Sequence, residues 1–548
     1  MKKVFVLLLT ILLSVMVITS CGEPAPTEEP APSPSTPATS EPEPSTSAPS
    51  PSASTPSKPA PSPTSPAAGE PQYGGTLKMV MQDSPGNIGY QISMSFADMI
   101  RAVPWAERLI VCEKDGSLKP NLAESWTTDP DAGTITFKLR NDVVFHDGTP
   151  FNAEAVRWNL QVMLDAKTLP NSSNVKSVEV LDEYTVQVTL NEFSARMLYA
   201  LWRPFMFSPT AFEENGKDWC IMNAVGTGPF KVTKFQQDVG LTLEKFDDYW
   251  REGRPYLDGI DIKIVKEAAT CAAMIQSGQA DFWYQAPNKE GAELRDKGFG
   301  YKVWPTTIII LAPDSKNEDS PLANKVVREA IEYAIDRDAM TQALGYGFAK
   351  AMIQPVLPEG AAADPAFEER KYNVEKAKQL LADAGYPDGF EMTLDYQIKN
   401  QDIGVVIQNY LADVNITVNP EPCDEGRFWG KQFSEGWSGL HLTYVGTQGA
   451  ACIPFLDHFG PEPLVGFFSM AKSQEFLDAC NEVVAATTFE DMQSASVNMA
   501  RVATDDVMVI PLFTNQQLIL FRDNVHTSFL TKYDQDGWDI WEDWMSQD

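Results

Sequence analysis

The chain has 548 residues, which exceeds one ordinary domain and leaves enough apolar material for two or three cores. Its 43 Lys and Arg residues stand against 75 Asp and Glu residues, a formal net charge of −32. This charge argues against binding to nucleic acid or to an anionic lipid surface, and in most acidic proteins it serves solubility.

The N-terminal segment is typical of a bacterial export signal. Lys2 and Lys3 precede the apolar run Val4 to Ile18, which is shorter than the roughly 20 residues that a membrane-spanning helix needs. The run ends in Ile18-Thr19-Ser20-Cys21, which resembles a bacterial lipobox. Residues 1–21 are therefore predicted to be a lipoprotein signal, with Cys21 as the lipidated residue. An ordinary secretory signal or a membrane-anchoring helix is the alternative.

Residues 22–70 are rich in Pro, Ser, Thr, Ala and Glu and contain no aromatic residue. Such a segment cannot bury enough apolar surface to offset the entropy of ordering, so it is predicted to be disordered. Its prolines favour an extended chain of up to about 3.1 Å per residue. We interpret it as a tether that holds the folded body away from the membrane, and the sequence leaves its glycosylation open.

The folded body begins with a short strand after a Gly-Gly turn, in residues 73–80. In residues 134–140 apolar and polar side chains alternate, which predicts a half-buried strand. Asn152 stands at an N-cap position before apolar residues that recur every four positions, which predicts a helix. Residues 178–190 predict a β-hairpin.

Helices and strands alternate in the second half of the chain. Residues 326–335 form an amphipathic pattern, and Arg328 and Glu332 on its polar side are expected to be solvated. Residues 373–385 predict a capped helix, and a strand is predicted to follow at 390–396. This alternation is typical of the α/β class.

Four separated motifs carry a family resemblance. They are Leu122-Ala123-Glu124-Ser125-Trp126, Phe137-Lys138-Leu139-Arg140 with Phe145-His146-Asp147-Gly148-Thr149-Pro150, Asn223-Ala224-Val225-Gly226-Thr227-Gly228-Pro229-Phe230, and the helical segment from Pro321 to Leu344. The chain from Tyr73 onward resembles the extracellular solute-binding proteins of the oligopeptide, dipeptide and nickel family, which are the capture subunits of ABC importers. The resemblance implies a three-lobed, α/β, periplasmic-binding-protein-like fold of type II with an extra inserted lobe. It also implies that the ligand lies in an interlobe cleft that closes by hinge motion.

The resemblance also implies where the lobes begin and end. The first lobe is expected to be discontinuous and to comprise residues 71–113, 219–313 and 513–548. The inserted second lobe is expected at 114–218 and the third lobe at 314–512. The expected partners are a small solute, the permease subunits and their cytoplasmic ATPases, and the protein is expected to be a monomer.

Several residues are expected to contact ligand because of their place in the resembling fold. Asp83 and Asn87 follow the first strand, and a solvated turn is the alternative for both. Trp105 and Trp437 are candidate ligand platforms, although such aromatic residues more often belong to a core. Asn515 stands where the chain is expected to return to the first lobe.

The segment from Ser438 to Phe455 distinguishes this chain. In peptide-binding members of the family, an aromatic residue and then an aspartate lie here, and the aspartate pairs with the free α-amine of the peptide. Tyr444 can supply the aromatic ring, but the segment contains no acid, and Thr447 and Gln448 occupy roughly its place. A buried ammonium needs a charged partner. Either the amine is paired elsewhere or, as we favour, the solute is not a free-amine peptide.

Metal binding and catalysis have little support in the sequence. There are four histidines and no His-x-x-x-His or Cys-x-x-Cys pair. His441 lies near the expected cleft and could contact a metal chelate, or it is an ordinary strand histidine. Neither a Gly-x-Ser-x-Gly nor a His-Glu-x-x-His motif is present, so neither enzymatic activity nor a cofactor is expected. The six cysteines besides Cys21 fit disulfides or buried thiols equally well.

These observations predict a protein that is lipid-anchored at the extracytoplasmic face of a bacterial cell membrane, in the periplasm or cell-wall zone. It is expected to capture a small solute and to deliver it to an ABC importer. A surface receptor that senses a peptide-like signal without transport is the alternative. A secreted hydrolase is a more distant possibility, which turnover of a bound ligand would reveal.

Overall fold

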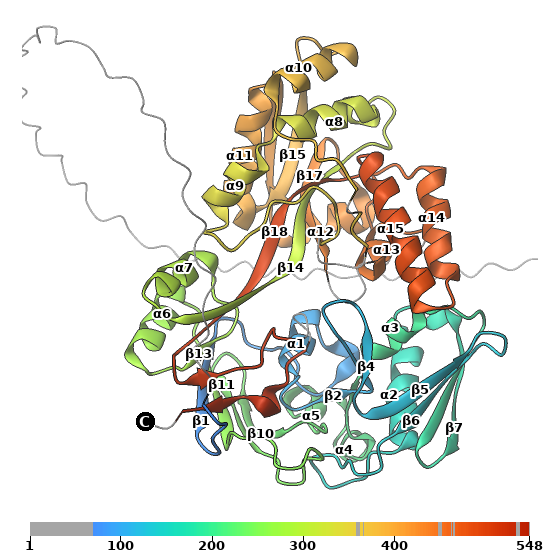
Figure 1. Cartoon of the computed structure of the whole chain (residues 1–548), viewed down its shortest axis with the longest axis vertical. Helices are drawn as coiled ribbons and strands as arrows, with labels where there is room; N and C mark the ends of the chain where they lie inside the picture. Colours follow the sequence, from blue (N-terminus) through green and yellow to red (C-terminus); the bar gives the residue numbers. More distant parts are fainter. Residues whose placement is uncertain are drawn as a thin grey trace, which may run out of the picture. The chain divides into compact units, whose positions relative to one another are not determined.

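The computed structural model describes residues 69–357, 362–364, 366–447, 452–461, 463, 466–532 and 537–546. The predicted signal, all but the last two residues of the predicted tether, and Gln448 lie outside the described residues. A mixed ten-stranded sheet is the largest element (Figure 1). Its strands are, in spatial order, β10 (Phe230–Gln236), β11 (Gly240–Lys245), β12 (Gly259–Ile264), β1 (Thr76–Met81), β13 (Phe282–Trp283), β18 (Ile510–Phe521), β14 (Gly300–Pro313), β17 (Leu440–Gly446), β15 (Phe390–Gln397) and β16 (Ile416–Cys423).

Helices occur in the chain both before and after the long strand β14. Those before β14 are α1 (Phe96–Arg101), α2 (Ala153–Asp165), α3 (Met197–Trp202), α4 (Pro209–Asn215), α5 (Lys217–Met222), α6 (Ala268–Ser277) and α7 (Asn288–Asp296). Those after β14 are α8 (Lys325–Ala334), α9 (Arg337–Leu344), α10 (Val374–Asp383), α11 (Gln401–Ala412), α12 (Glu425–Gly430), α13 (Cys452–Phe459), α14 (Gln474–Ala485) and α15 (Phe489–Asp505). Short strand pairs are β2 (Glu107–Arg108) with β9 (Phe205–Met206), β3 (Ile110–Cys112) with β4 (Leu118–Pro120), and β19 (Val525–His526) with β20 (Trp544–Met545).

The strands between residues 123 and 190 form a separate four-stranded sheet. Its order is β5 (Ala123–Asp129), β6 (Thr134–Leu139), β8 (Thr185–Leu190) and β7 (Val175–Asp182). Every second side chain of β6 is buried, and α2 begins after Asn152, whose side chain accepts a hydrogen bond from Ala155 N at 3.0 Å. The predicted strand, hairpin and helix are therefore confirmed. The lobe bounds given above stay predictions.

The helix predicted at 326–335 is confirmed as α8, but the expectation that its charges are solvated is wrong. Arg328 is 8% exposed and donates to the carbonyl oxygens of Asp506 at 2.6 Å and Val507 at 2.8 Å. Glu332 is 3% exposed and pairs with Arg370 at 2.6 Å. Arg328 thus caps backbone carbonyls that would otherwise be unsatisfied, a role that its own helix pattern cannot reveal.

A buried carboxylate, Glu107 of β2, joins the family motif Asn223–Phe230 to the later residues Tyr249 and Trp250. It accepts hydrogen bonds from Thr227 Oγ1 at 3.1 Å, Tyr249 OH at 3.0 Å and Trp250 Nε1 at 3.0 Å. Burial raises the pKa of Glu107, and the charge of Arg251 and these three donors oppose the rise. One acid outside the motif thus holds Thr227 of the motif together with Tyr249 and Trp250.

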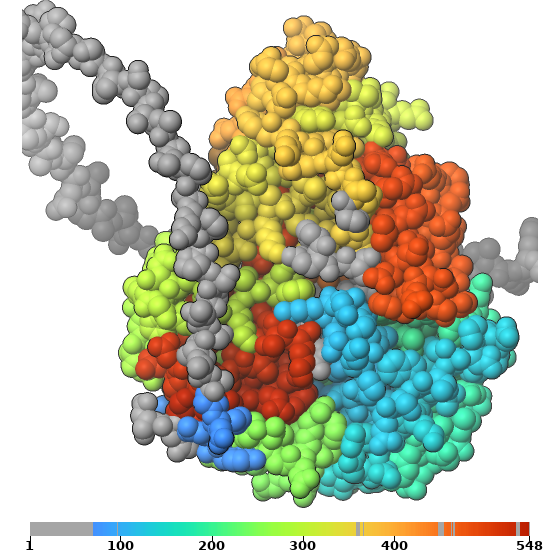
Figure 2. Space-filling model, in the orientation of Figure 1, coloured from blue at the N-terminus to red at the C-terminus, as the bar shows by residue number. Residues whose placement is uncertain are grey.

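The C-terminal residues pack on the first part of the chain, as Figure 2 shows beside the blue N-terminal strand. Trp538 stacks on Phe282 of β13 at 5.6 Å between ring centroids. Asp543, which is 1% exposed, accepts hydrogen bonds from Ser528 N and Oγ, Thr527 Oγ1 and Trp538 Nε1 at 2.7–2.9 Å. Burial raises the pKa of Asp543 to about 6.

The five cysteines whose side chains the structure describes are buried thiols: Cys112, Cys220, Cys271, Cys423 and Cys480. Burial raises the pKa of Cys271 to about 11 and that of Cys480 to about 12. Of the two alternatives that the sequence leaves open, these five follow the buried-thiol one.

Candidate functional site

Two long strands carry the chain through the ten-stranded sheet. β14 and β18 pair antiparallel along almost their whole length (Figure 1), and the register shifts between Pro305 and Thr307. From Thr307 onward, β14 also pairs with β17 on its other edge. We call the segments Trp304–Thr307 of β14 and Thr514–Gln517 of β18 the strand crossing.

Several buried polar atoms at the strand crossing lack a hydrogen-bond partner among the described residues. They are Trp304 Nε1, Thr307 Oγ1 and both amide atoms of Gln517. Gln517 is 2% exposed and opposes Trp304, so the two side chains share one face of the strand pair. A buried polar group without a partner costs about 1–3 kcal/mol. The strand crossing therefore has hydrogen-bonding capacity for a bound molecule.

Two lysines flank Trp304. The Lys114 ammonium lies 4.4 Å from the centroid of the Trp304 ring and donates to Leu530 O at 2.7 Å. Lys302 donates to Thr527 O at 2.6 Å and to Thr531 Oγ1 at 2.7 Å. Burial lowers the pKa of Lys302; the nearby charge of Lys114 lowers it further, whereas Asp543 opposes the change. One ammonium group thus lies against the Trp304 ring, and a second, on Lys302, lies near the carboxylate of Asp543.

Three of the predicted contact residues reach the neighbourhood of the strand crossing. Thr447 donates from Oγ1 to Pro305 O at 2.9 Å and from its backbone N to Thr306 O at 3.2 Å. Asn515 is exposed and opposes Thr307 across the ladder. Tyr444 is half-buried on β17, and burial raises its pKa, with the charge of Glu425 adding to the rise. Their contact with ligand stays a prediction.

The contact residues predicted before β2 lie in other surroundings. The Asn87 amide donates to Tyr90 O and Ser93 Oγ, and its oxygen accepts from Gly89 N and Tyr90 N, so its hydrogen-bonding capacity is used within its own loop. Asp83 is exposed. Trp105 is 1% exposed and donates from Nε1 to Ile88 O at 2.9 Å, as a core residue does.

His441 and Trp437 are also core residues in this structure. The His441 ring is fully buried between Phe428, at 4.4 Å between centroids, and Trp437, at 4.7 Å. Its Nδ1 lies 2.5 Å from Asp395 Oδ2, and its Nε2 lies 3.2 Å from Gln432 Oε1. Both ring nitrogens are therefore engaged, which favours the ordinary strand histidine over a metal contact. The described residues contain no cluster of three or more His, Cys, Asp or Glu that could hold a metal ion.

An aromatic group that the sequence did not predict lies beside Tyr444. Trp429 stacks on Phe433 at 5.3 Å between ring centroids, and its ring lies edge-on to Tyr444 at 6.0 Å. Phe433 is 46% exposed. The spacing of four between Trp429 and Phe433 was the available signal. Trp304 and Gln517 were missed as well, and the only hint of Gln517 is a polar break in an otherwise apolar strand.

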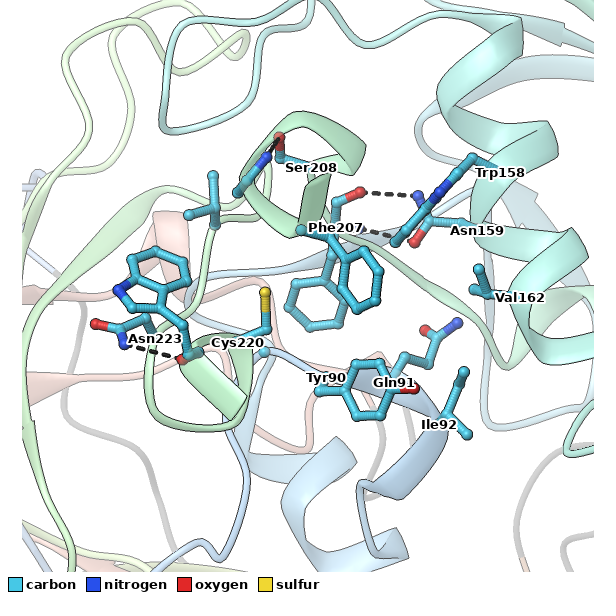
Figure 3. A pocket seen from close by; sticks show the side chains of 15 residues that line it. Tyr90, Gln91, Ile92, Trp158, Asn159, Val162, Phe207, Ser208, Cys220 and Asn223 are labelled. Carbon is cyan, nitrogen blue, oxygen red and sulfur yellow. Dashed lines mark hydrogen bonds between the residues drawn. The ribbon is translucent and has the colours of Figure 1, made fainter. Parts of the chain in front are cut away.

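A small pocket of about 20 Å³ lies between α2 and the α4–α5 segment (Figure 3). Tyr90 and Phe212 stack in its wall at 5.7 Å between centroids. The Asn159 amide exchanges hydrogen bonds with the backbone of Phe207, at 2.8 and 3.1 Å. Among the described side chains that line this pocket, one buried polar atom, Gln91 Oε1, has no hydrogen-bond partner. The strand crossing, which gathers several such atoms, is the stronger candidate site.

No helix in the described part of the chain has both the length and the apolar character needed to cross a bilayer.

Residues 117–459 match the sequence profile of the bacterial extracellular solute-binding proteins, family 5 (middle region). The chain belongs to this family. Among its curated relatives, the glutathione-binding protein GsiB of Shigella flexneri is 34% identical over 346 residues, which cover 61% of this chain and 67% of that protein. The family resemblance found in the sequence is thereby confirmed.

Solved structures of family members share the fold. DppA from Helicobacter pylori, in complex with the peptide STSA, superposes with a TM-score of 0.69 at 22% identity and covers 87% of this chain and 99% of its own. NikA from Brucella suis, in complex with Fe(III)-EDTA, superposes with a TM-score of 0.75 at 20% identity and covers 85% of this chain and 100% of its own. The predicted periplasmic-binding-protein fold of type II is confirmed. Family 5 proteins are extracytoplasmic binding proteins that deliver solutes to ABC importers.

Proposed function

We propose that this family 5 protein captures a small polar solute at the strand crossing and delivers it to an ABC permease with its ATPases. The observation that carries the proposal is the set of buried, unpartnered polar atoms of Trp304, Thr307 and Gln517 on the two strands that span the sheet. A protein that keeps such atoms without a partner loses stability unless a ligand or water satisfies them.

We further propose that a lipid on Cys21 anchors the mature protein and that residues 22–70 act as its tether. The support is the lipobox-like Ile18-Thr19-Ser20-Cys21 and the apolar run before it. Residues 22–70 would let the binding body reach a permease in the same membrane. Sensing without transport stays the alternative, and a neighbouring pair of permease genes would favour transport.

The solute class is open between several chemistries. The relatives and neighbours named above bind glutathione, a peptide and a metal chelate, respectively. In this chain, no acid stands between Ser438 and Phe455 to pair with a peptide amine. We therefore propose that a free α-amine is not the group by which the solute is recognised.

The test is thermal unfolding of the chain from residue 22 onward, with Cys21 removed, against a panel of solutes. The panel holds glutathione, di- to pentapeptides with free and with blocked amines, nickel with histidine, and oligosaccharides. A ligand at 100 times its Kd should add about 2.7 kcal/mol to the free energy of unfolding.

Two variants tie binding to the strand crossing. Trp304→Phe removes the Nε1 donor and Gln517→Leu removes both amide atoms, so each should weaken binding of the stabilising solute. Trp219→Phe, a partly exposed tryptophan at the pocket of Figure 3, is the matched control and should bind normally. A panel in which no solute stabilises the protein would refute capture, and full binding by both crossing variants would refute the site.

A further inference from the structure

A short segment after β8, in the predicted second lobe, contacts the end of α14 in the predicted third lobe. Ala195 donates its backbone N–H to Ala486 O at 2.8 Å. The Ser194 hydroxyl donates to Val484 O at 2.5 Å, across 290 residues of the chain. Ser194 is 5% exposed and Ala195 is 4% exposed, so both donors lie inside the contact. Two adjacent residues thus bind two carbonyl groups at one helix end.

The helix end that they bind needs such donors. The last four carbonyl groups of a helix have no partner within the helix and must be satisfied from outside it. Many helices meet this need with a left-handed residue just after the last turn. α14 instead ends at Ala486 in an extended conformation, with φ −61° and ψ 131°. Ser194 and Ala195 therefore cap a helix that belongs to another part of the chain.

Apolar packing accompanies the two hydrogen bonds. Buried apolar side chains from both sides belong to one cluster, among them Phe193, Met197, Phe455 and Val483. Arg203 adds a charge pair with Asp457 of α13, whose nearest atoms are 3.8 Å apart. At this distance the pair adds little, so apolar burial and the capping of α14 are the main sources of affinity between the two sides.

A groove of about 460 Å³ borders this contact and is lined from both sides. Asn171 and Glu192 line it beside the Ser194 segment, and Leu456 and Asn481 line it from α13 and α14. A core packed to native density leaves no space of this size. Interfaces between lobes that move are, by contrast, more polar and more open to water than a core. The groove therefore favours a contact that opens without unfolding either side.

We propose that Ser194 and Ala195 form a latch on the end of α14, which closes when the predicted second and third lobes meet and opens when they part. Opening leaves no buried group without a partner, because water can replace both donors at the helix end. The latch stabilises the closed form without touching solute, since neither residue belongs to the strand crossing. Its effect on solute affinity rests on the proposed function, whereas its opening does not.

The first experiment needs no solute. Hydrogen exchange is followed by mass spectrometry in the chain from residue 22 onward, in peptides that contain Ala195 and in peptides that cover the last turn of α14. Ser194→Ala removes one hydrogen bond and should accelerate exchange about 2- to 10-fold in both sets of peptides. Exchange in β16, at the far edge of the ten-stranded sheet, should stay unchanged.

Ser177→Ala is the matched control for this experiment. It removes an exposed hydrogen bond to Glu179 on β7 and should leave exchange on both sides of the latch unchanged. Acceleration confined to the peptides that contain Ala195, with none at the end of α14, would show a local bond and overturn the latch. No acceleration in either set would overturn it as well.

The second experiment links the latch to capture. Calorimetric titration compares Ser194→Ala with the unsubstituted protein, with glutathione and with each other solute of the panel above as the probe. A solute that binds only the closed form should bind the variant about 2- to 10-fold more weakly, because less of the variant is closed. Unchanged affinity for a solute that does bind would overturn this link. If no solute binds the unsubstituted protein, capture fails, and the exchange experiment still decides whether the latch exists.

Discussion

Glu107 offers a quantitative test of how the fold is held together. Glu107→Ala leaves three buried donors, from Thr227, Tyr249 and Trp250, without their acceptor. At about 1–3 kcal/mol for each orphaned donor, with partial relief by hydroxyl rotation, the free energy of unfolding should fall by about 3–6 kcal/mol.

Glu107→Gln should behave differently. The amide oxygen can replace Oε2, which accepts from Thr227 and Trp250, while the amide NH₂ faces the Tyr249 hydroxyl. The variant loses the attraction to Arg251 but no longer buries a charge, so the two changes offset one another. We expect a loss of about 1 kcal/mol or less.

The assay is urea unfolding followed by tryptophan fluorescence, with the change in free energy taken from the shift of the midpoint at constant slope. Glu124→Ala, an exposed glutamate on β5, is the control and should stay within about 0.5 kcal/mol of the unsubstituted protein. If Glu107→Gln costs as much as Glu107→Ala, the charge rather than the hydrogen bonds is what matters. A harmless Glu107→Ala would refute the reasoning entirely.

Three further outcomes are expected. Cys21→Ser should move the protein from the membrane fraction to the soluble fraction, and unchanged membrane association would contradict the lipid anchor. Because burial raises the pKa of Asp543 to about 6, its stabilising contribution is complete below about pH 4 and is lost as the pH rises through 6. The stability of the protein relative to Asp543→Asn should therefore fall by about 3 kcal/mol between pH 4 and 7 in thermal melts, and parallel curves would disprove it. Gly226→Ala would place a Cβ 2.1 Å from the Trp105 carbonyl oxygen and should abolish soluble expression, whereas Gly86→Ala, with nothing within 4 Å, should express normally.

Local patterns predicted the elements of this fold well because short-range physics decides them. The alternation in residues 134–140 gave β6, and the caps at Asn152 and Asn373 gave the starts of α2 and α10. The family motifs gave the architecture, since they lie in the expected order along the chain. Each of these signals is complete within a few neighbouring residues.

The candidate site could not be read in the same way. Trp304 and Gln517 are more than 200 residues apart, and a shifted strand register decides which side chains face each other there. His441 lies in a segment that was expected to line the cleft. Its side chain is instead bonded to Asp395 on a neighbouring strand and belongs to the core. Arg328 likewise looks like a surface charge until the loop after α15 supplies the carbonyls that it binds.

The buried cysteines have a practical consequence for measuring solute-driven motion. Thiols that are shielded and kept protonated react slowly with maleimides, because the thiolate is the reactive form. Once Cys21 and Cys452 are replaced by serine, a cysteine introduced at exposed Lys138 on β6 and another at exposed Asp383 on α10 would be the fast-labelling sites. A donor and an acceptor fluorophore at these two positions would report, molecule by molecule, whether β6 and α10 approach each other when solute is added.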